Sequence, residues 1–161
     1  MAVVEDAFDR IRRKMVAARI EFMSQLATFH REDLVAQTFQ GEKSPIYISH
    51  LLYIVDGLAL EQMRRVQEEE DPLLENFVEQ VQLVAHAAHP PHSLEAVLAG
   101  MAARREEMFE YLAHLPAEAW ERPFHHDEWG SRKFYQLVSM VPLYDQQHTR
   151  QLMDLKTEQK A

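Results

Sequence analysis

Four long segments of the chain carry apolar residues three or four positions apart, which is the spacing of one face of an α-helix. The segments cover about residues 4–29, 45–69, 94–115 and 132–152. Ser44, Ser93 and Ser131 precede the last three, and a serine oxygen there can cap the free N–H groups of a helix start. Four amphipathic helices with connections of moderate length predict an all-α fold, a four-helix bundle.

The chain between the second and third segments predicts a short extra helix. Asp71 and Pro72 repeat the cap-and-proline start of the second helix. Apolar residues then follow at Leu74, Phe77, Val78 and Val81. Because the 161 residues contain no repeat and no flexible linker, we expect a single domain over residues 1–161.

Composition excludes several classes of function. A net charge of -9 lacks the basic footprint that binding to a nucleic-acid backbone requires. The absence of cysteine removes disulfides, a thiolate nucleophile and zinc sites built from cysteine. The sequence has no long apolar run of the kind that indicates a membrane span or a signal peptide. We therefore expect a cytoplasmic protein that binds no membrane.

Two connections between the predicted helices contain clustered histidines. His86, His89 and His92 are three positions apart, but prolines interrupt the helix that would align them, and we expect a solvated loop. The segment from Phe124 to Gly130 also predicts a loop. Its neighbouring residues His125 and His126 point to opposite sides of an extended chain, so at most one can face a site.

The last segment places polar residues on its apolar face. At about 100° per residue, six side chains fall within roughly 80° of one another. They are Phe134, Val138, Val141, Asp145, His148 and Leu152. Tyr144 lies at the edge of this face, and Pro142 should bend the helix nearby.

Burying Asp145 and His148 costs roughly several kcal/mol of folding free energy unless each has a partner, such as a hydrogen-bonding group, an opposite charge or a metal. One interpretation is a core histidine bonded to a backbone carbonyl or to Asp145, with Tyr144 as an ordinary core residue. The other is a ligand or metal site on which Tyr144, Asp145 and His148 converge. The sequence leaves both open.

Two further polar residues belong to buried stripes. Arg105 lies within the apolar stripe of the third helix and keeps its charge, so it needs Asp145, Asp56 or Glu61 as a partner if it is buried. Alternatively, its stem covers apolar surface with the head in water. His50 lies at the rim of the stripe on the second helix, where it can be either a partly exposed residue or a ligand.

Three stretches resemble the DinB / YfiT-like superfamily of metalloenzymes over nearly the whole chain. They are His50-Leu51, the Trp129-Gly130 turn after His126, and the C-terminal stretch from Tyr144 to Leu152. The resemblance implies a four-helix bundle that holds a divalent metal such as nickel or zinc. One histidine on the second helix and two on the last are the usual ligands, which would be His50, His148 and, in place of a histidine, Tyr144.

Phenol is a poor ligand because its pKa is near 10, so Asp145 or water can take the third place. Two imidazoles with Asp145 would suit zinc, nickel or manganese. The resemblance then implies a metal-dependent enzyme, such as a thiol transferase or hydrolase acting on a small-molecule substrate. The alternative is a non-catalytic bundle that has lost tight metal binding through Tyr144 and binds a small molecule or a partner. A homodimer is compatible with either.

Overall fold

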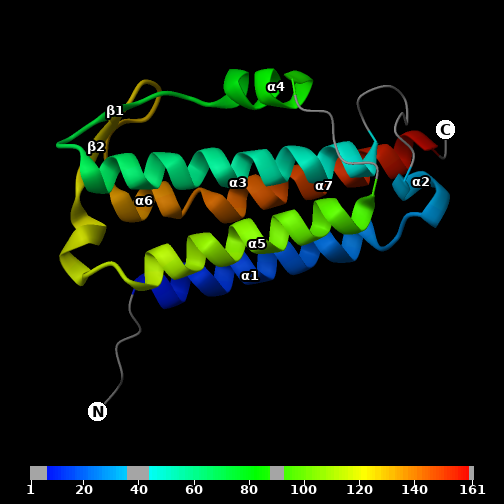
Figure 1. Cartoon of the computed structure of the whole chain (residues 1–161), viewed down its shortest axis with the longest axis horizontal. Helices are drawn as coiled ribbons and strands as arrows, with labels where there is room; N and C mark the ends of the chain where they lie inside the picture. Colours follow the sequence, from blue (N-terminus) through cyan, green and yellow to red (C-terminus); the bar gives the residue numbers. More distant parts are fainter. Residues whose placement is uncertain (1–6, 36–43, 88–92, 160–161) are drawn as a thin grey trace, which may run out of the picture.

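The computed structural model describes residues 7–35, 44–87 and 93–159, and its four long helices form the bundle that the apolar pattern predicts (Figure 1). The helices are α1 (Ala7–Leu26), α3 (Pro45–Glu68), α5 (Leu94–Ala113) and α7 (Val141–Gln159). A short helix, α2 (Arg31–Val35), follows α1. Within these residues no helix combines the length and the apolar composition needed to cross a membrane.

The first and last helices run in the same direction, and so do the two middle ones (Figure 1). Met15 of α1 belongs to the same core cluster as Val141 at the start of α7, whereas Leu26 clusters with Leu152 near the end. In the same way, the early residues of α3 cluster with early residues of α5 and late with late. Because α3 and α5 run in the same direction, a long connection outside the bundle is needed between the end of α3 and the start of α5.

The predicted helix starts at Ser44 and Ser93 are confirmed. The Ser44 side chain accepts a hydrogen bond from the Tyr47 N–H at 3.1 Å, and Pro45 occupies the first turn, where its missing N–H costs nothing. The Ser93 side chain accepts from the Ala96 N–H at 3.2 Å. The two middle helices thus begin where local chemistry places them.

The connection from α3 to α5 contains the extra helix, but the predicted start of that helix is wrong. Asp71 has a positive φ of 43°, and the chain then extends into a two-residue strand, β1 (Leu73–Leu74). Helix α4 (Val78–Ala87) begins later, where the Asn76 side chain accepts from the Val78 N–H at 2.9 Å. Strand pairing has overridden the cap-and-proline signal. Of the three spaced histidines, His86 is exposed on α4, and His89 and His92 lie outside the described residues.

The expected loop after Phe124 is a β-hairpin, so that prediction is wrong. A 3-10 helix, η1 (Ala117–Glu121), leads into β2 (Pro123–His126), which pairs antiparallel with β3 (Gly130–Lys133) and parallel with β1. Gly130 has a φ of 77°, which favours glycine. The alternation expected for the histidine pair is confirmed, because His125 is exposed and His126 is buried.

Ser131 lies in β3 and does not cap the last helix, which corrects another prediction. The helix begins instead as α6 (Phe134–Val138), where the Gln136 side chain accepts from the Lys133 N–H at 2.9 Å. The chain breaks at Ser139 and Met140 and resumes as α7, with Pro142 in its first turn. Proline thus marks a full break between two helices, where we expected a bend within one.

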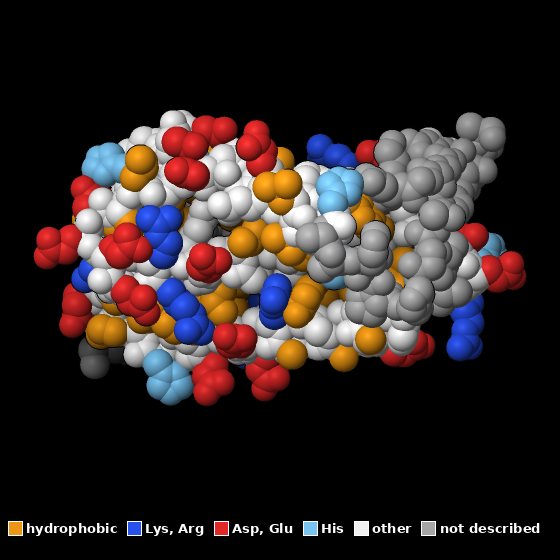
Figure 2. All heavy atoms as spheres, turned by 45° about the horizontal axis from the view of Figure 1, so that its top comes forward, with side chains coloured by type: hydrophobic (Ala, Val, Ile, Leu, Met, Phe, Trp, Pro, Cys, Tyr) orange, Lys and Arg blue, Asp and Glu red, His pale blue; other side chains and the backbone are white. Residues whose placement is uncertain are grey.

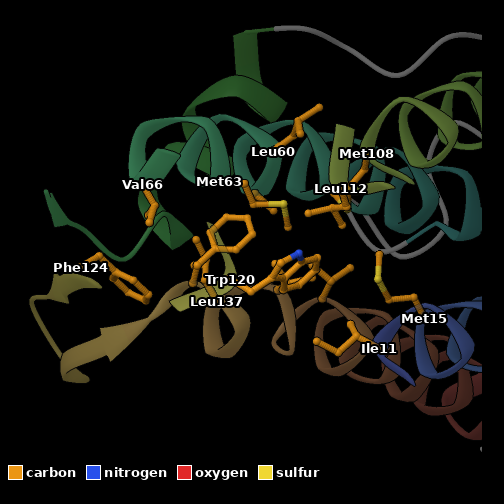
Figure 3. Packing of buried hydrophobic residues seen from close by; sticks show 14 of the residues in the cluster. Ile11, Met15, Leu60, Met63, Val66, Met108, Leu112, Trp120, Phe124 and Leu137 are labelled. Carbon is orange, nitrogen blue, oxygen red and sulfur yellow. The ribbon is translucent and has the colours of Figure 1, made fainter. Parts of the chain in front are cut away.

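The largest core cluster lies at the end of the bundle that carries the hairpin. Figure 3 shows Trp120 beside Leu137, with Met63 and Leu112 close by. The Trp120 ring meets the Phe134 ring edge to face, with centroids 5.3 Å apart. This apolar packing anchors α6 and the hairpin to the bundle and leaves the polar residues nearer its middle.

Candidate functional site

The polar residues predicted to face inward from the last helix do so. Asp145 is fully buried and His148 is 8% exposed, on the same face as Val141 and Leu152. Tyr144, at the edge of this face, is only partly buried. The helical spacing therefore identified the buried polar positions correctly. Asp145 and His148 each have a hydrogen-bond partner that offsets the cost of burial.

Asp145 lies in the centre of the bundle between two guanidinium groups. Arg105 Nη2 and Arg19 Nη2 each donate to Asp145 Oδ1 at 3.1 Å. Asp56 accepts from the same two atoms, at 3.0 Å from Arg105 Nη2 and 2.8 Å from Arg19 Nη2. Each of the four long helices contributes one residue to this cluster, which we call the charge quartet: Arg19, Asp56, Arg105 and Asp145.

Most of the charged atoms that are buried in the charge quartet have a hydrogen-bond partner of opposite charge. Burial alone would lower the pKa of Arg105, but the negative charges of Asp56 and Asp145 outweigh it and hold that pKa above its ordinary value. Two positive and two negative groups leave the quartet neutral. Two of the predicted partners of Arg105 are thus confirmed, whereas Glu61 is exposed.

Arg19 is the member of the quartet that our sequence analysis missed. It lies four residues after Met15 and three before Phe22, both of which are fully buried. That spacing places it on the inward face of α1. A charged residue inside an apolar stripe is the same signal that identified Arg105, so the sequence did contain it.

The backbone orients His148. Its Nδ1 lies 2.7 Å from the Tyr144 carbonyl oxygen, which can only accept, so Nδ1 carries the proton. Burial lowers the pKa of His148, although that hydrogen bond and the charge of Asp145 act in the opposite direction. The ring is therefore neutral near pH 7, with the lone pair on Nε2. This is the bond to a backbone carbonyl that we considered from the sequence.

Tyr144 packs against an aromatic neighbour from outside the bundle. Its ring meets Phe77 edge to face, with centroids 5.4 Å apart and an interplanar angle of 67°. Burial raises the pKa of Tyr144 to about 12, so the phenol stays protonated at neutral pH. A protonated phenol is a weak donor to a metal ion.

His50 is more buried than a residue at a helix rim. It is 6% exposed, and its ring stacks on Tyr53 with centroids 6.1 Å apart. Tyr53 is in turn covered by the Arg104 guanidinium, 3.8 Å from the ring centroid. His50 is therefore an interior residue. Its position is compatible with a metal ligand and equally with a structural core residue.

Within the described residues, no three His, Asp or Glu side chains are grouped so that they could hold one ion. Asp145 accepts from the arginines, and Tyr144 contacts Phe77. The set His50, Tyr144, Asp145 and His148 stays a prediction as a metal site. What this part of the molecule establishes is a buried charge cluster with a neutral, oriented imidazole three residues along α7.

A separate cavity of about 190 Å³ lies where α4, the hairpin and α7 meet. It is lined by Asn76, Phe77, Val78, His126, Trp129, Met140, Tyr144 and Gln147. His126 is 5% exposed, and it is the one member of the pair His125 and His126 that faces inward, where the sequence allowed at most one to face a site. The hairpin that forms one wall was not predicted, so neither was the cavity.

These features define a class of protein: a four-helix bundle whose first and last helices run in the same direction, with a small sheet at one end and a cluster of buried polar residues inside. A model of the DinB superfamily matches residues 7–152, and the chain belongs to that superfamily. The resemblance drawn from the sequence is thereby confirmed. No curated protein matches the chain.

Two solved structures share the fold. YfiT from Bacillus subtilis, described as a probable metal-dependent hydrolase with an unusual four-helix bundle topology, superposes with a TM-score of 0.71 at 12% identity, covering 99% of this chain and 91% of its own. TT2238, a four-helix bundle protein, gives a TM-score of 0.60 at 18% identity, covering 91% of this chain and 97% of its own. At these identities the likeness establishes the fold alone.

Proposed function

We propose that this protein is a non-catalytic member of the DinB superfamily that has lost tight metal binding and binds a small molecule. The observation that carries the proposal is the engagement of Asp145 with both Arg19 and Arg105. A carboxylate between two arginines would have to break charge-assisted bonds before it could bind a cation. It is therefore a poor replacement for a missing histidine ligand.

The remaining donor set also argues against a tightly held ion. Tyr144 takes the place of a usual histidine, and burial keeps its phenol protonated well above neutral pH. Only His50 and His148 are left as strong donors, whereas protein sites for catalytic zinc ordinarily supply three. The residues present do not fit a stable metal centre.

One observation favours a second candidate, a metal-dependent hydrolase or thiol transferase. The hydrogen bond from His148 Nδ1 to the Tyr144 carbonyl is the kind of contact that orients metal-bound histidines. It leaves Nε2 as the available donor on a ring that is already neutral. Two imidazoles and solvent would then have to bind nickel, zinc or manganese.

Metal analysis separates the two candidates. The protein would be purified without a chelator or histidine tag, its metal content measured, and its melting temperature followed during titration with Ni²⁺, Zn²⁺ and Mn²⁺. The proposal predicts much less than one equivalent of metal and no saturable rise in melting temperature. One equivalent, with a saturable rise that His148→Ala removes, would establish the second candidate instead.

A further inference from the structure

The cavity between α4, the hairpin and α7 is bounded by three parts of the chain that are distant in sequence. Asn76 and Phe77 come from the segment just before α4, His126 and Trp129 from the hairpin, and Tyr144 from α7. Its volume of about 190 Å³ corresponds to roughly six water molecules. That space suits a compound of fragment size.

His126 presents a hydrogen-bond donor there. The backbone N–H groups of Glu128 and Trp129 both donate to His126 Nδ1, at 3.1 and 3.3 Å. Asp127 Oδ1 lies 3.2 Å from the same nitrogen, but burial lowers the pKa of His126, and two donors already point at its lone pair. The ring is therefore neutral with its proton on Nε2. In the described part of the chain, that N–H has no acceptor.

Tyr144 and Gln147 add further polar groups. The phenol O–H of Tyr144 makes no hydrogen bond to any described residue, and neither does the side-chain amide of Gln147. Asn76 differs, because its oxygen caps α4 and its nitrogen donates to Glu128 at 2.9 Å. One N–H donor from His126 and one O–H donor from Tyr144 thus line a space whose other polar side chains are the uncharged amides of Asn76 and Gln147.

The described residues that line the cavity are uncharged at neutral pH, and several of them are aromatic. The rings of His126 and Trp129 stack with centroids 3.7 Å apart and planes within 7°. Phe77 adds another aromatic surface. Asp127 and Glu128 form part of the hairpin turn, and acidic side chains are spread over the face of the molecule that carries α4 and the hairpin (Figure 2). This surrounding charge disfavours anions.

We propose that this cavity binds an uncharged planar compound with a carbonyl or ring-nitrogen acceptor, stacked against the aromatic walls and hydrogen-bonded by Tyr144 and His126. This inference rests on the proposed function and locates the small molecule. The ring would contact Phe77 and Trp129, because aromatic groups pack well in offset-stacked or edge-to-face arrangements. The acceptor would bind donors that have no acceptor among the described residues.

The test is a titration of ¹⁵N-labelled protein with benzamide, followed by NMR in the presence of EDTA. The proposal predicts a saturable shift of the Trp129 indole signal and of backbone signals around Phe77 and Gln147, with α5 signals such as Ala96 unmoved. Toluene lacks the acceptor, and benzoate and benzylammonium carry charge, so each should bind more weakly. Equal binding of benzoate would overturn the proposed class, and shifts located elsewhere would overturn the site.

Tyr144→Phe is the decisive variant, because it removes one oxygen and keeps the ring. We expect it to weaken benzamide binding roughly tenfold, the effect of losing one good hydrogen bond. Tyr135→Phe, which removes an exposed phenol outside the cavity, is the matched control and should leave binding unchanged. An unchanged benzamide affinity in Tyr144→Phe would overturn the proposal.

Because EDTA removes any metal, the benzamide titration tests ligand binding in the cavity independently of the proposed loss of metal binding. A protein that holds one equivalent of metal in the earlier experiment contradicts the loss of metal binding, but the benzamide titration still reports on the cavity. A metal-free protein that shows no saturable shift with benzamide contradicts the cavity proposal alone.

Discussion

Arg105 and Asp145 are 40 residues apart in sequence and meet in the middle of the bundle, with Arg105 Nη1 3.2 Å from Asp145 Oδ2 and Arg105 Nη2 3.1 Å from Asp145 Oδ1. This two-pronged contact joins α5 to α7. Asp56 and Arg19 complete the cluster from α3 and α1. A neutral set of four charges thereby fixes the relative positions of all four long helices.

Removing one member of the charge quartet should be costly. Arg105→Met leaves two buried carboxylates facing one arginine, and the loss of one partner from a buried ion pair costs about 3–5 kcal/mol. We expect the free energy of unfolding, measured by urea denaturation, to fall by that amount. Arg64→Met is the control, since its pair with Glu107 is exposed and should contribute less than about 1 kcal/mol. Similar losses in both variants would contradict this account of the quartet.

Arg19→Met should cost less than Arg105→Met. The Arg19 side chain is 15% exposed and that of Arg105 only 6%, so water can partly replace Arg19 beside the carboxylates. The loss of its charge-assisted hydrogen bonds should lower the free energy of unfolding by about 1.5–3 kcal/mol. The same urea measurement checks it, and a loss greater than that of Arg105→Met would reverse the predicted order.

Stability should decline as the pH falls below about 6.5, the ordinary pKa of histidine. Burial lowers the pKa values of both His126 and His148 in the folded protein. Between the unfolded and folded pKa values, the unfolded chain binds more protons, and the free energy of unfolding decreases as protons are added. The two histidines therefore do not lower the free energy of unfolding above about pH 6.5. They lower it by their full amount below their folded pKa values.

Titration of the histidine ring protons by NMR measures these values directly in metal-free protein. The midpoints for His126 and His148 should lie below about 6.5. The thermal melting temperature should fall over the same pH range. A midpoint above 6.5 for His148 would mean that the charges of Asp145 and Asp56 outweigh burial, and stability would then rise on acidification through that group.

The bundle could be predicted from the sequence because its signals are local or periodic. Apolar spacing located the four long helices, and Ser44 and Ser93 marked two starts through side-chain caps a few residues away. The inward orientation of Asp145 and His148 followed from the same helical period. Arg105 was correctly paired because a permanent charge within an apolar stripe has few alternatives.

The sheet was missed because its evidence is not local. Leu73 and Leu74 extend because β2 lies beside them, and no pattern in two residues can indicate a partner 52 positions later. Ser131 looked like a helix cap for the same reason, since its role in β3 depends on pairing with His125. The cavity depends on the hairpin and on α4 together, so no single segment could have predicted it.

The most direct test of the central claim compares zinc binding by the wild-type protein and Tyr144→His. The account predicts that the wild type retains far less than one equivalent of zinc after gel filtration, because only two strong donors are present. The variant restores the second histidine four residues before His148 and should bind close to one equivalent. A wild-type protein that already holds one equivalent of zinc would contradict the account.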